Sequence, residues 1–104
     1  MEPHSFETIL THFAESSIVP SVQTLMPITA GSDLPPYASR SGELFIYVLD
    51  GILTLDFDGQ TAQISPGDSA HFLTEQKHRY YNTSRFPTKI FVANLNSSKK
   101  LAAD

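Results

Sequence analysis

The stretch ELFIYVLDGILTLDFDGQTAQISPGDSAHFLTEQKHRYYN, residues 43–82, indicates the fold class because it alternates short apolar runs with turn residues. The run LFIYVL (44–49) predicts a β-strand. A hairpin is predicted at 52–64. Its turn falls at Asp58-Gly59, since a primed two-residue turn requires positive φ, which glycine adopts without strain. Pro66-Gly67-Asp68 turns the chain again before further short strands. The pattern predicts an all-β antiparallel sandwich or barrel.

The whole chain of 104 residues fits a single domain, 1–104, with the barrel at about 20–95. The N-terminal segment has a different pattern. Ser5 is a good capping residue, and the apolar residues that follow it recur at helical intervals. We therefore expect a short N-terminal helix at about 6–14. The polar residues 96–104 are expected to form a frayed tail.

Composition argues against several classes of protein. The chain has no cysteine, which excludes a disulfide framework, a thiolate metal site and a cysteine nucleophile, and which fits a cytoplasmic protein. The longest apolar run is far shorter than the roughly 20 residues that span a bilayer, so no membrane association is expected. The net charge is −4, and the basic residues alternate with apolar ones instead of clustering. We therefore expect no direct nucleic-acid binding.

Four short motifs occur in a characteristic order. They are the Val48-Leu49-Asp50-Gly51 turn, Asp58-Gly59, Pro66-Gly67-Asp68, and His78 followed by Asn82. In this order and spacing the chain resembles the cupin superfamily over about residues 20–95. The resemblance implies a cupin-type double-stranded antiparallel β-barrel, which is jelly-roll-like and holds a ligand cavity between its sheets.

The resemblance also implies a metal site, and here the sequence departs from the family pattern. Metal-binding cupins carry two histidines spaced one apart, then a glutamate six residues before the glycine of the V-L-x-G turn, and a histidine of the later motif. In this chain Leu44 occupies the glutamate position, and residues 37–41 contain no histidine. Only His78 remains. One imidazole cannot hold a catalytic divalent ion, which needs about three protein ligands. No cofactor is therefore expected.

A non-standard metal site stays open as an alternative. Glu43 lies one residue from the ligand position and should face the other side of the sheet, but a bulge near Ser41-Gly42 would turn it inward. Together with His71 and His78 it would form a site in which a divalent metal is possible. The protein would then be a small metal-dependent enzyme, such as an isomerase, dioxygenase or lyase. Otherwise the sequence shows no catalytic residues, because no Ser-His-Asp arrangement and no paired carboxylates can be argued.

His78 is the centre of the candidate binding site. Alternation places His78, Tyr80 and Asn82 on one face of a strand, where they can hydrogen-bond a ligand. The alternative for His78 is a structural bond to a backbone carbonyl or a tyrosine. Arg40 would bind an anion if it points inward, or else it is a solvated loop residue. The full set of candidate ligand-binding residues is His78, Tyr80, Asn82, Arg40, Tyr37, Leu44, Ile46 and Val48.

The strand at 44–49 is apolar on both faces, so both faces should be covered. Leu44, Ile46 and Val48 are expected to face the interior. The outward residues would be covered by the N-terminal helix or by a second subunit. Cupins commonly dimerise through such a surface, so the resemblance implies a homodimer.

The function expected from these features is binding of a small polar or anionic molecule, for sensing or sequestration. Segment 78–82 and Leu44 look similar to the sensing domains that follow a helix-turn-helix in some bacterial transcriptional regulators. No such DNA-binding segment is present in these residues, so a regulatory output would need a partner. The alternatives are the metal-dependent enzyme and a structural or partner-binding barrel. In the latter, Leu44, Val48, Phe72 and Tyr80 would fill the interior.

Overall fold

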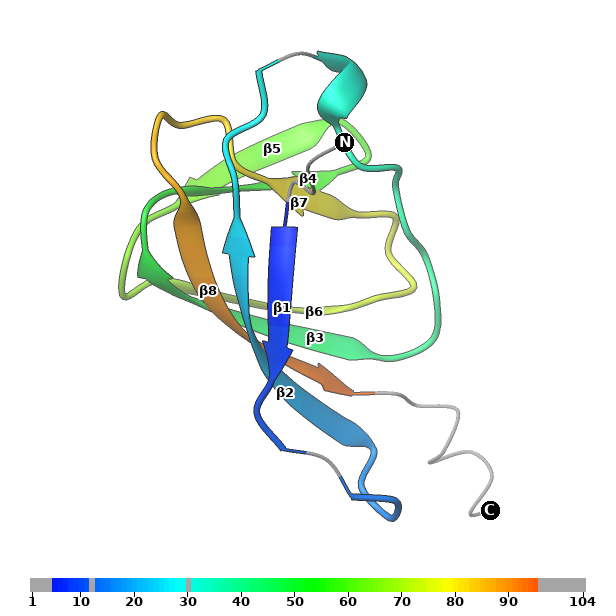
Figure 1. Ribbon diagram of the computed structural model, residues 1–104. Coiled ribbons are helices and arrows are strands. Elements are labelled where there is room, and N and C mark those ends of the chain that lie inside the picture. The colour runs from blue at the N-terminus through cyan, green and yellow to red at the C-terminus, as the bar shows by residue number, and fades with distance from the viewer. Residues whose placement is uncertain (1–4, 12, 30, 96–104) are drawn as a thin grey trace.

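The chain folds into two antiparallel sheets whose inner faces share one core (Figure 1). The computed structural model describes residues 5–11, 13–29 and 31–95. One sheet has the strand order β1-β2-β8-β3-β6, and the other has the order β5-β4-β7. The described strands are β1 (Ser5–Ile9), β2 (Ile18–Leu25), β3 (Glu43–Asp50), β4 (Leu53–Phe57), β5 (Gln60–Ile64), β6 (Ser69–Leu73), β7 (Arg79–Tyr81) and β8 (Thr88–Leu95).

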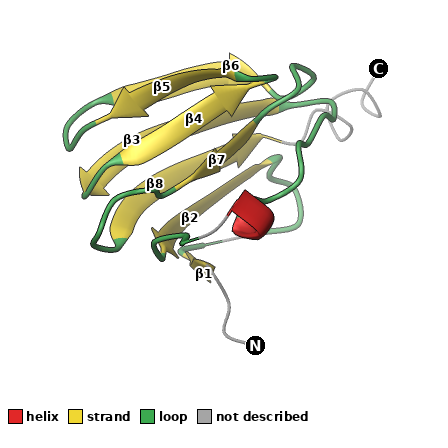
Figure 2. Cartoon of the chain, turned by 90° about the horizontal axis from the view of Figure 1, so that it is seen from above, coloured by secondary structure: helices red, strands yellow, loops and turns green. Residues whose placement is uncertain are grey.

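The expected N-terminal helix at 6–14 is wrong. Ser5–Ile9 form strand β1, which pairs antiparallel with β2 at the edge of the larger sheet. Figure 2 shows η1 (Gly31–Asp33), a short turn of 3₁₀-helix, as the helical element of the described residues. A helix of about nine residues is marginal in water unless one face packs against the protein. Phe6 and Ile9 remain 53% and 56% exposed, so the apolar residues of this segment do not pack against the core. The segment instead pairs its backbone groups with the edge of β2.

The core lies between β3 and β8 of the larger sheet and β4 and β5 of the smaller one. Leu44, Ile46 and Val48 of β3 are buried and face inward, as the alternation predicted. They meet Leu53 and Leu55 of β4 in one hydrophobic cluster. The aromatic ring of Phe57 packs edge-on against Phe72 of β6, with 4.9 Å between the ring centroids, which fixes β4 over β6.

The outer face of β3 carries Phe45, Tyr47 and Leu49. Phe45 packs against Phe91 of β8, while Tyr47 and Leu49 remain exposed. The expected cover by an N-terminal helix is absent from the described residues, since β1 extends the same sheet instead of crossing it. The homodimer stays a prediction.

Two turns predicted from sequence have the backbone geometry that their residues require. Asp58 and Gly59 both have positive φ, 52° and 98°, as a primed hairpin turn between β4 and β5 demands. Gly51 has φ 84°, and a Cβ on it would lie 2.7 Å from the hydroxyl oxygen of Thr88. Thr88 in turn donates to the carbonyl of Ile52 and accepts from its amide. The β3–β4 turn is therefore held against β8 by a contact that only glycine permits.

The described strands run to Leu95, close to the expected end of the barrel. The tail predicted at 96–104 lies outside the described residues. No helix in the described part of the chain is long and apolar enough to cross a membrane.

Candidate functional site

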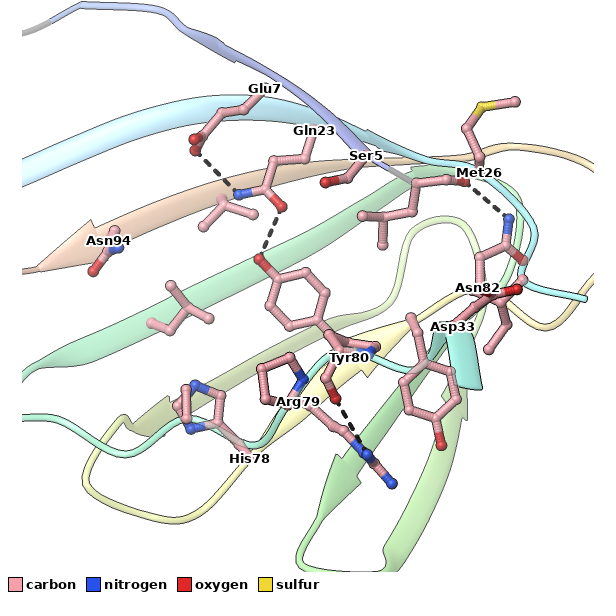
Figure 3. Close-up of a pocket in the computed structure, with 18 of the residues that line it drawn as sticks. Ser5, Glu7, Gln23, Met26, Asp33, His78, Arg79, Tyr80, Asn82 and Asn94 are labelled. Atoms are coloured by element: carbon pink, nitrogen blue, oxygen red, sulfur yellow. Dashed lines mark hydrogen bonds between the residues drawn. The ribbon is translucent and has the colours of Figure 1, made fainter. Parts of the chain in front are cut away.

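A cavity of about 660 Å³ opens between the sheets, on the side where β7 faces β1 and β2 (Figure 3). Its volume is in the range of sites that hold small molecules. Five of the predicted binding residues line it, namely Arg40, Leu44, His78, Tyr80 and Asn82. The other lining residues are Ser5, Glu7, Gln23, Leu25, Met26, Ile28, Asp33, Pro35, Pro36, Ala38, Arg79, Tyr81, Val92 and Asn94.

His78 presents a hydrogen-bond acceptor to this cavity. It is 6% exposed, and its backbone forms an isolated bridge with Ala38 of the loop before β3. Its Nδ1 lies 2.7 Å from the carbonyl oxygen of Gln76. A carbonyl only accepts, so Nδ1 carries the proton and donates, and in the neutral ring Nε2 is left as an acceptor. The structural alternative and the binding role therefore use different nitrogens of the same ring.

Tyr80 leads a chain of hydrogen bonds across the cavity, drawn as dashed lines in Figure 3. Its hydroxyl donates to Gln23 Oε1 at 2.8 Å, and Gln23 Nε2 donates to Glu7 Oε2 at 3.1 Å. Desolvation raises the pKa of Tyr80 above its ordinary value, although the bond to Gln23 opposes the shift. Tyr80 therefore remains a donor at neutral pH, and this fixes the orientation of the Gln23 amide.

Asn82 is occupied by structural bonds. Its Nδ2 donates to the carbonyls of Leu25 and Phe86, at 3.0 and 2.7 Å. Its Oδ1 accepts from the amide and the hydroxyl of Ser84. The side chain ties the β7–β8 connection to the end of β2. It forms part of the cavity wall, with its donors and acceptor already in use.

Arg40 lies at the mouth of the cavity and is exposed. Its backbone amide donates to the carbonyl of Thr74, which holds the loop next to β6. Arg40 and Tyr80 both line the cavity, and the positive charge of Arg40 lowers the pKa of Tyr80, against the larger effect of desolvation. Among the described residues no carboxylate forms an ion pair with Arg40.

Three other predicted residues do not line the cavity. Ile46 and Val48 lie deeper, in the closed core. Tyr37 is directed elsewhere, and its hydroxyl donates to both carboxylate oxygens of Asp56 at 3.0 Å. The structure thus brings together His78, Tyr80, Asn82, Leu44 and Arg40. It leaves Tyr37 on the opposite face of the smaller sheet.

Asp56 is the centre of a network that the sequence interpretation missed. It is buried on the outer face of β4 and accepts from Arg79 Nε at 2.8 Å and from the amide of Gly59 at 2.8 Å. Desolvation alone raises its pKa, but the hydrogen bonds from Arg79, Gly59 and Tyr37 outweigh this and hold the pKa below its ordinary value. The Arg79 guanidinium also stacks over the Tyr37 ring at 4.0 Å and donates to the carbonyl of Pro35.

The Asp56 network fastens the loop at 34–40 over the smaller sheet, and this loop supplies Pro35, Ala38 and Arg40 to the cavity. One signal for it was present in the sequence. Alternation already put Arg79 on the face opposite His78, and Asp56 lies on the outward face of the predicted hairpin strand, where an arginine on a neighbouring strand can pair with it.

The three candidate metal ligands do not come together: Glu43 and His71 lie on the outer face of the larger sheet, whereas His78 precedes β7 of the smaller sheet and lines the cavity. Glu43 and His71 pair at 2.8 Å between Oε2 and Nε2, with side chains 39% and 61% exposed. Phe72, the neighbour of His71, faces the interior and packs against His78 at 5.1 Å. His71 therefore points away from His78. Glu43 faces the outer side of the sheet, as alternation predicted, and the inward rotation that the alternative metal site required does not occur. Within the described residues no group of three His, Asp or Glu side chains could hold a metal ion. The residues present do not fit the divalent metal that the family pattern implies.

We compared the chain with known protein families, curated proteins and solved structures. A family model for the cupin domain matches residues 24–94. The curated proteins give no match.

Several solved structures have the same fold. The cupin domain of an XRE family transcriptional regulator from Enterobacter cloacae superimposes with a TM-score of 0.78 at 18% identity, covering 90% of this chain and 98% of that one. An HTH_3 family transcriptional regulator from Vibrio cholerae gives 0.72 at 18% identity, covering 89% of this chain and 51% of that one. The polyketide cyclase RemF from Streptomyces resistomycificus gives 0.75 at 18% identity, with 88% and 65% covered. Identities this low establish the fold alone.

Proposed function

The chain belongs to the cupin domain family, and on this basis we propose that its barrel binds a small polar or anionic molecule in a sensing or sequestering role. The ligand would occupy the cavity between β7 and the β1–β2 edge. We assign no catalytic residue to it. The cytoplasmic location also remains part of this proposal.

The observation that carries the proposal is the cavity itself, with its polar groups at one side of an apolar wall. His78 offers an acceptor at Nε2, and Arg40 offers a guanidinium that no described carboxylate neutralises. Leu44, Leu25 and Val92 supply the apolar wall. Such a combination of a few placed polar groups in an apolar concavity is typical of small-molecule sites.

The two alternative functions have less support. A metal-dependent enzyme requires a ligand set, and Glu43 and His71 lie outside the barrel, away from His78. A barrel filled by its own side chains would leave no void, whereas Tyr80 and Leu44 border an open volume of about 660 Å³. Binding without turnover therefore accounts for the features of this interior best.

The likeness to solved regulators supports a sensing role. This chain spans nearly the whole of the Enterobacter cloacae regulator domain and about half of the Vibrio cholerae regulator. Both proteins are described as transcriptional regulators. We propose a sensing role for this chain, with the output delivered by a partner.

The proposal is tested by a thermal-shift screen of small carboxylates, phosphates and polar metabolites against the protein and its Arg40→Gln variant. At least one anion should raise the Tm of the native protein, because a ligand that binds only the folded state stabilises it by mass action. Arg40→Gln should abolish that shift. Arg85→Gln is the matched control, since Arg85 is exposed and does not line the cavity. A screen with no shift would count against the proposal.

We also propose a homodimer formed through the outer face of the larger sheet. Tyr47 and Leu49 lie exposed beside the pair Phe45 and Phe91, and this is apolar area that an isolated subunit leaves in water. Light scattering coupled to gel filtration measures the molar mass in solution, which should be that of a dimer. A monomeric mass at tens of micromolar would contradict it.

A further inference from the structure

Two opposite charges border the polar side of the cavity without neutralising each other. Glu7 comes from β1, and Arg40 comes from the loop before β3. Both act on the Tyr80 hydroxyl, where Glu7 raises the pKa and Arg40 lowers it. Within the described part of the chain, no ion pair joins Glu7 to Arg40. Glu7 and Arg40 therefore both border the cavity and both act on the Tyr80 hydroxyl, without an ion pair between them. Asp33 and Arg79 also line the cavity, and Arg79 is paired with Asp56.

Glu7 is positioned as an acceptor that still has capacity. Its Oε2 accepts one bond, from Gln23 Nε2, and Gln23 is itself fixed by Tyr80. A carboxylate offers about four acceptor sites, so most of them remain available. An ammonium group, which has three donors and a positive charge, is the ligand group that complements such a carboxylate.

Arg40 complements the other end. A guanidinium presents five donors in a planar fork and pairs bidentately with a carboxylate. A simple anion would gain this contact, but it would also be held near the negative charge of Glu7. An amine alone would gain Glu7 and meet the positive charge of Arg40. Glu7 therefore disfavours a simple anion, and Arg40 disfavours a simple amine. A site can discriminate by such repulsion as well as by attraction.

We propose that the cavity selects a small zwitterion of the amino-acid class, with the ammonium group on Glu7 and the carboxylate on Arg40. An apolar side chain of the ligand would lie against Leu25, Leu44 and Val92. This inference rests on the proposed function and narrows its ligand. The selecting acid belongs to a strand that precedes residues 24–94, the part matched by the family model, so it is a property of this chain's β1–β2 hairpin.

The test is isothermal titration calorimetry at neutral pH and low salt with three probes that share the same branched apolar chain. They are leucine as either enantiomer, 3-methylbutylamine, which lacks the carboxylate, and 4-methylpentanoate, which lacks the amine. We expect leucine to bind at least about tenfold more tightly than either single-charge analogue. The variants Glu7→Gln and Arg40→Gln retain the shape of the site and remove one charge each. Both residues are exposed, so the variants should keep the native Tm in the absence of ligand.

The two variants should act in opposite ways. Glu7→Gln should weaken leucine and leave 4-methylpentanoate equal or tighter, while Arg40→Gln should weaken leucine and leave the amine equal or tighter. Glu15→Gln, an exposed acid away from the cavity, is the control and should change nothing. If 4-methylpentanoate or other anions bind as well as leucine and Glu7→Gln has no effect, the inference fails and the proposed function stands. If neither these probes nor any compound of the thermal-shift screen binds, both fail.

Discussion

The space between the two sheets has a closed side and an open side, and the contrast has a simple geometric origin. Where β4 and β5 lie over β3 and β6, Ile46, Val48 and Leu53 are fully buried. Where β7 lies over β2, Tyr80 reaches Gln23 across a cavity. The larger sheet has two more strands than the smaller one, so β1 extends beyond the cover that β7 provides. The cavity therefore results from the unequal width of the two sheets, and its polar side chains provide hydrogen-bonding groups for a ligand.

The two sides also differ in how their strands are composed. On the inner face of β8, Ile90 and Val92 give way to Asn94, which lines the cavity. On β2, Gln23 and Leu25 both line the cavity, one polar and one apolar. The closed side is lined by apolar residues, whereas on the open side polar residues join apolar ones such as Leu25 and Val92. The site is therefore an extension of the core in which burial is incomplete.

The largest effect is expected from removing volume on the closed side. Ile46→Ala should lower the free energy of unfolding by about 2–5 kcal/mol, because a fully buried side chain leaves a cavity that its neighbours fill only in part. Leu44→Ala should cost clearly less, since Leu44 already borders an open volume. Urea denaturation of both variants measures the difference. Equal losses would show that the two sides are packed alike.

A smaller effect is expected from the anchor of the loop that frames the open side. Asp56→Asn should destabilise the protein at neutral pH, because it removes the charge that Arg79 and Tyr37 contact. The folded pKa of Asp56 lies below its ordinary value of 3.8, so its stabilising contribution is present above pH 3.8 and is lost as the pH falls through the folded pKa. Urea midpoints of the native and variant proteins should therefore converge at acid pH. A difference that persists unchanged at pH 2 would contradict the charge argument.

The smallest effect on stability is expected on the open side. Tyr80→Phe removes the donor to Gln23 and should cost roughly 0.5–1.5 kcal/mol, and no more, because water in the cavity can replace the lost bond. Because desolvation raises its pKa, Tyr80 should also ionise later than an ordinary tyrosine. Ultraviolet titration at alkaline pH, with Tyr47→Phe as the exposed control, measures this. If Tyr80→Phe removes an early phase of the titration, Tyr80 is not desolvated as described.

The sequence predicted the features that depend on a few neighbouring residues. The inward face of β3, the Asp58-Gly59 turn and the place of His78 all follow from alternation and from backbone preferences, which act over short distances along the chain. The family follows from four such motifs in order. The departure from the metal pattern is visible in Leu44 and in the absence of histidine from residues 37–41. In each case the physical cause lies within the segment itself.

The tertiary structure decided what depends on distant partners. Ser5–Ile9 became a strand because the edge of β2 accepted it, against the helical spacing of its own residues. Tyr80 and Gln23 are 57 residues apart in sequence, and Tyr37 and Asp56 are 19 apart. Glu7 enters the site only through the pairing of β1 with β2. The sequence determines which chemical groups each segment carries. Which of these groups meet across the cavity is determined by how two sheets of unequal width pack against each other.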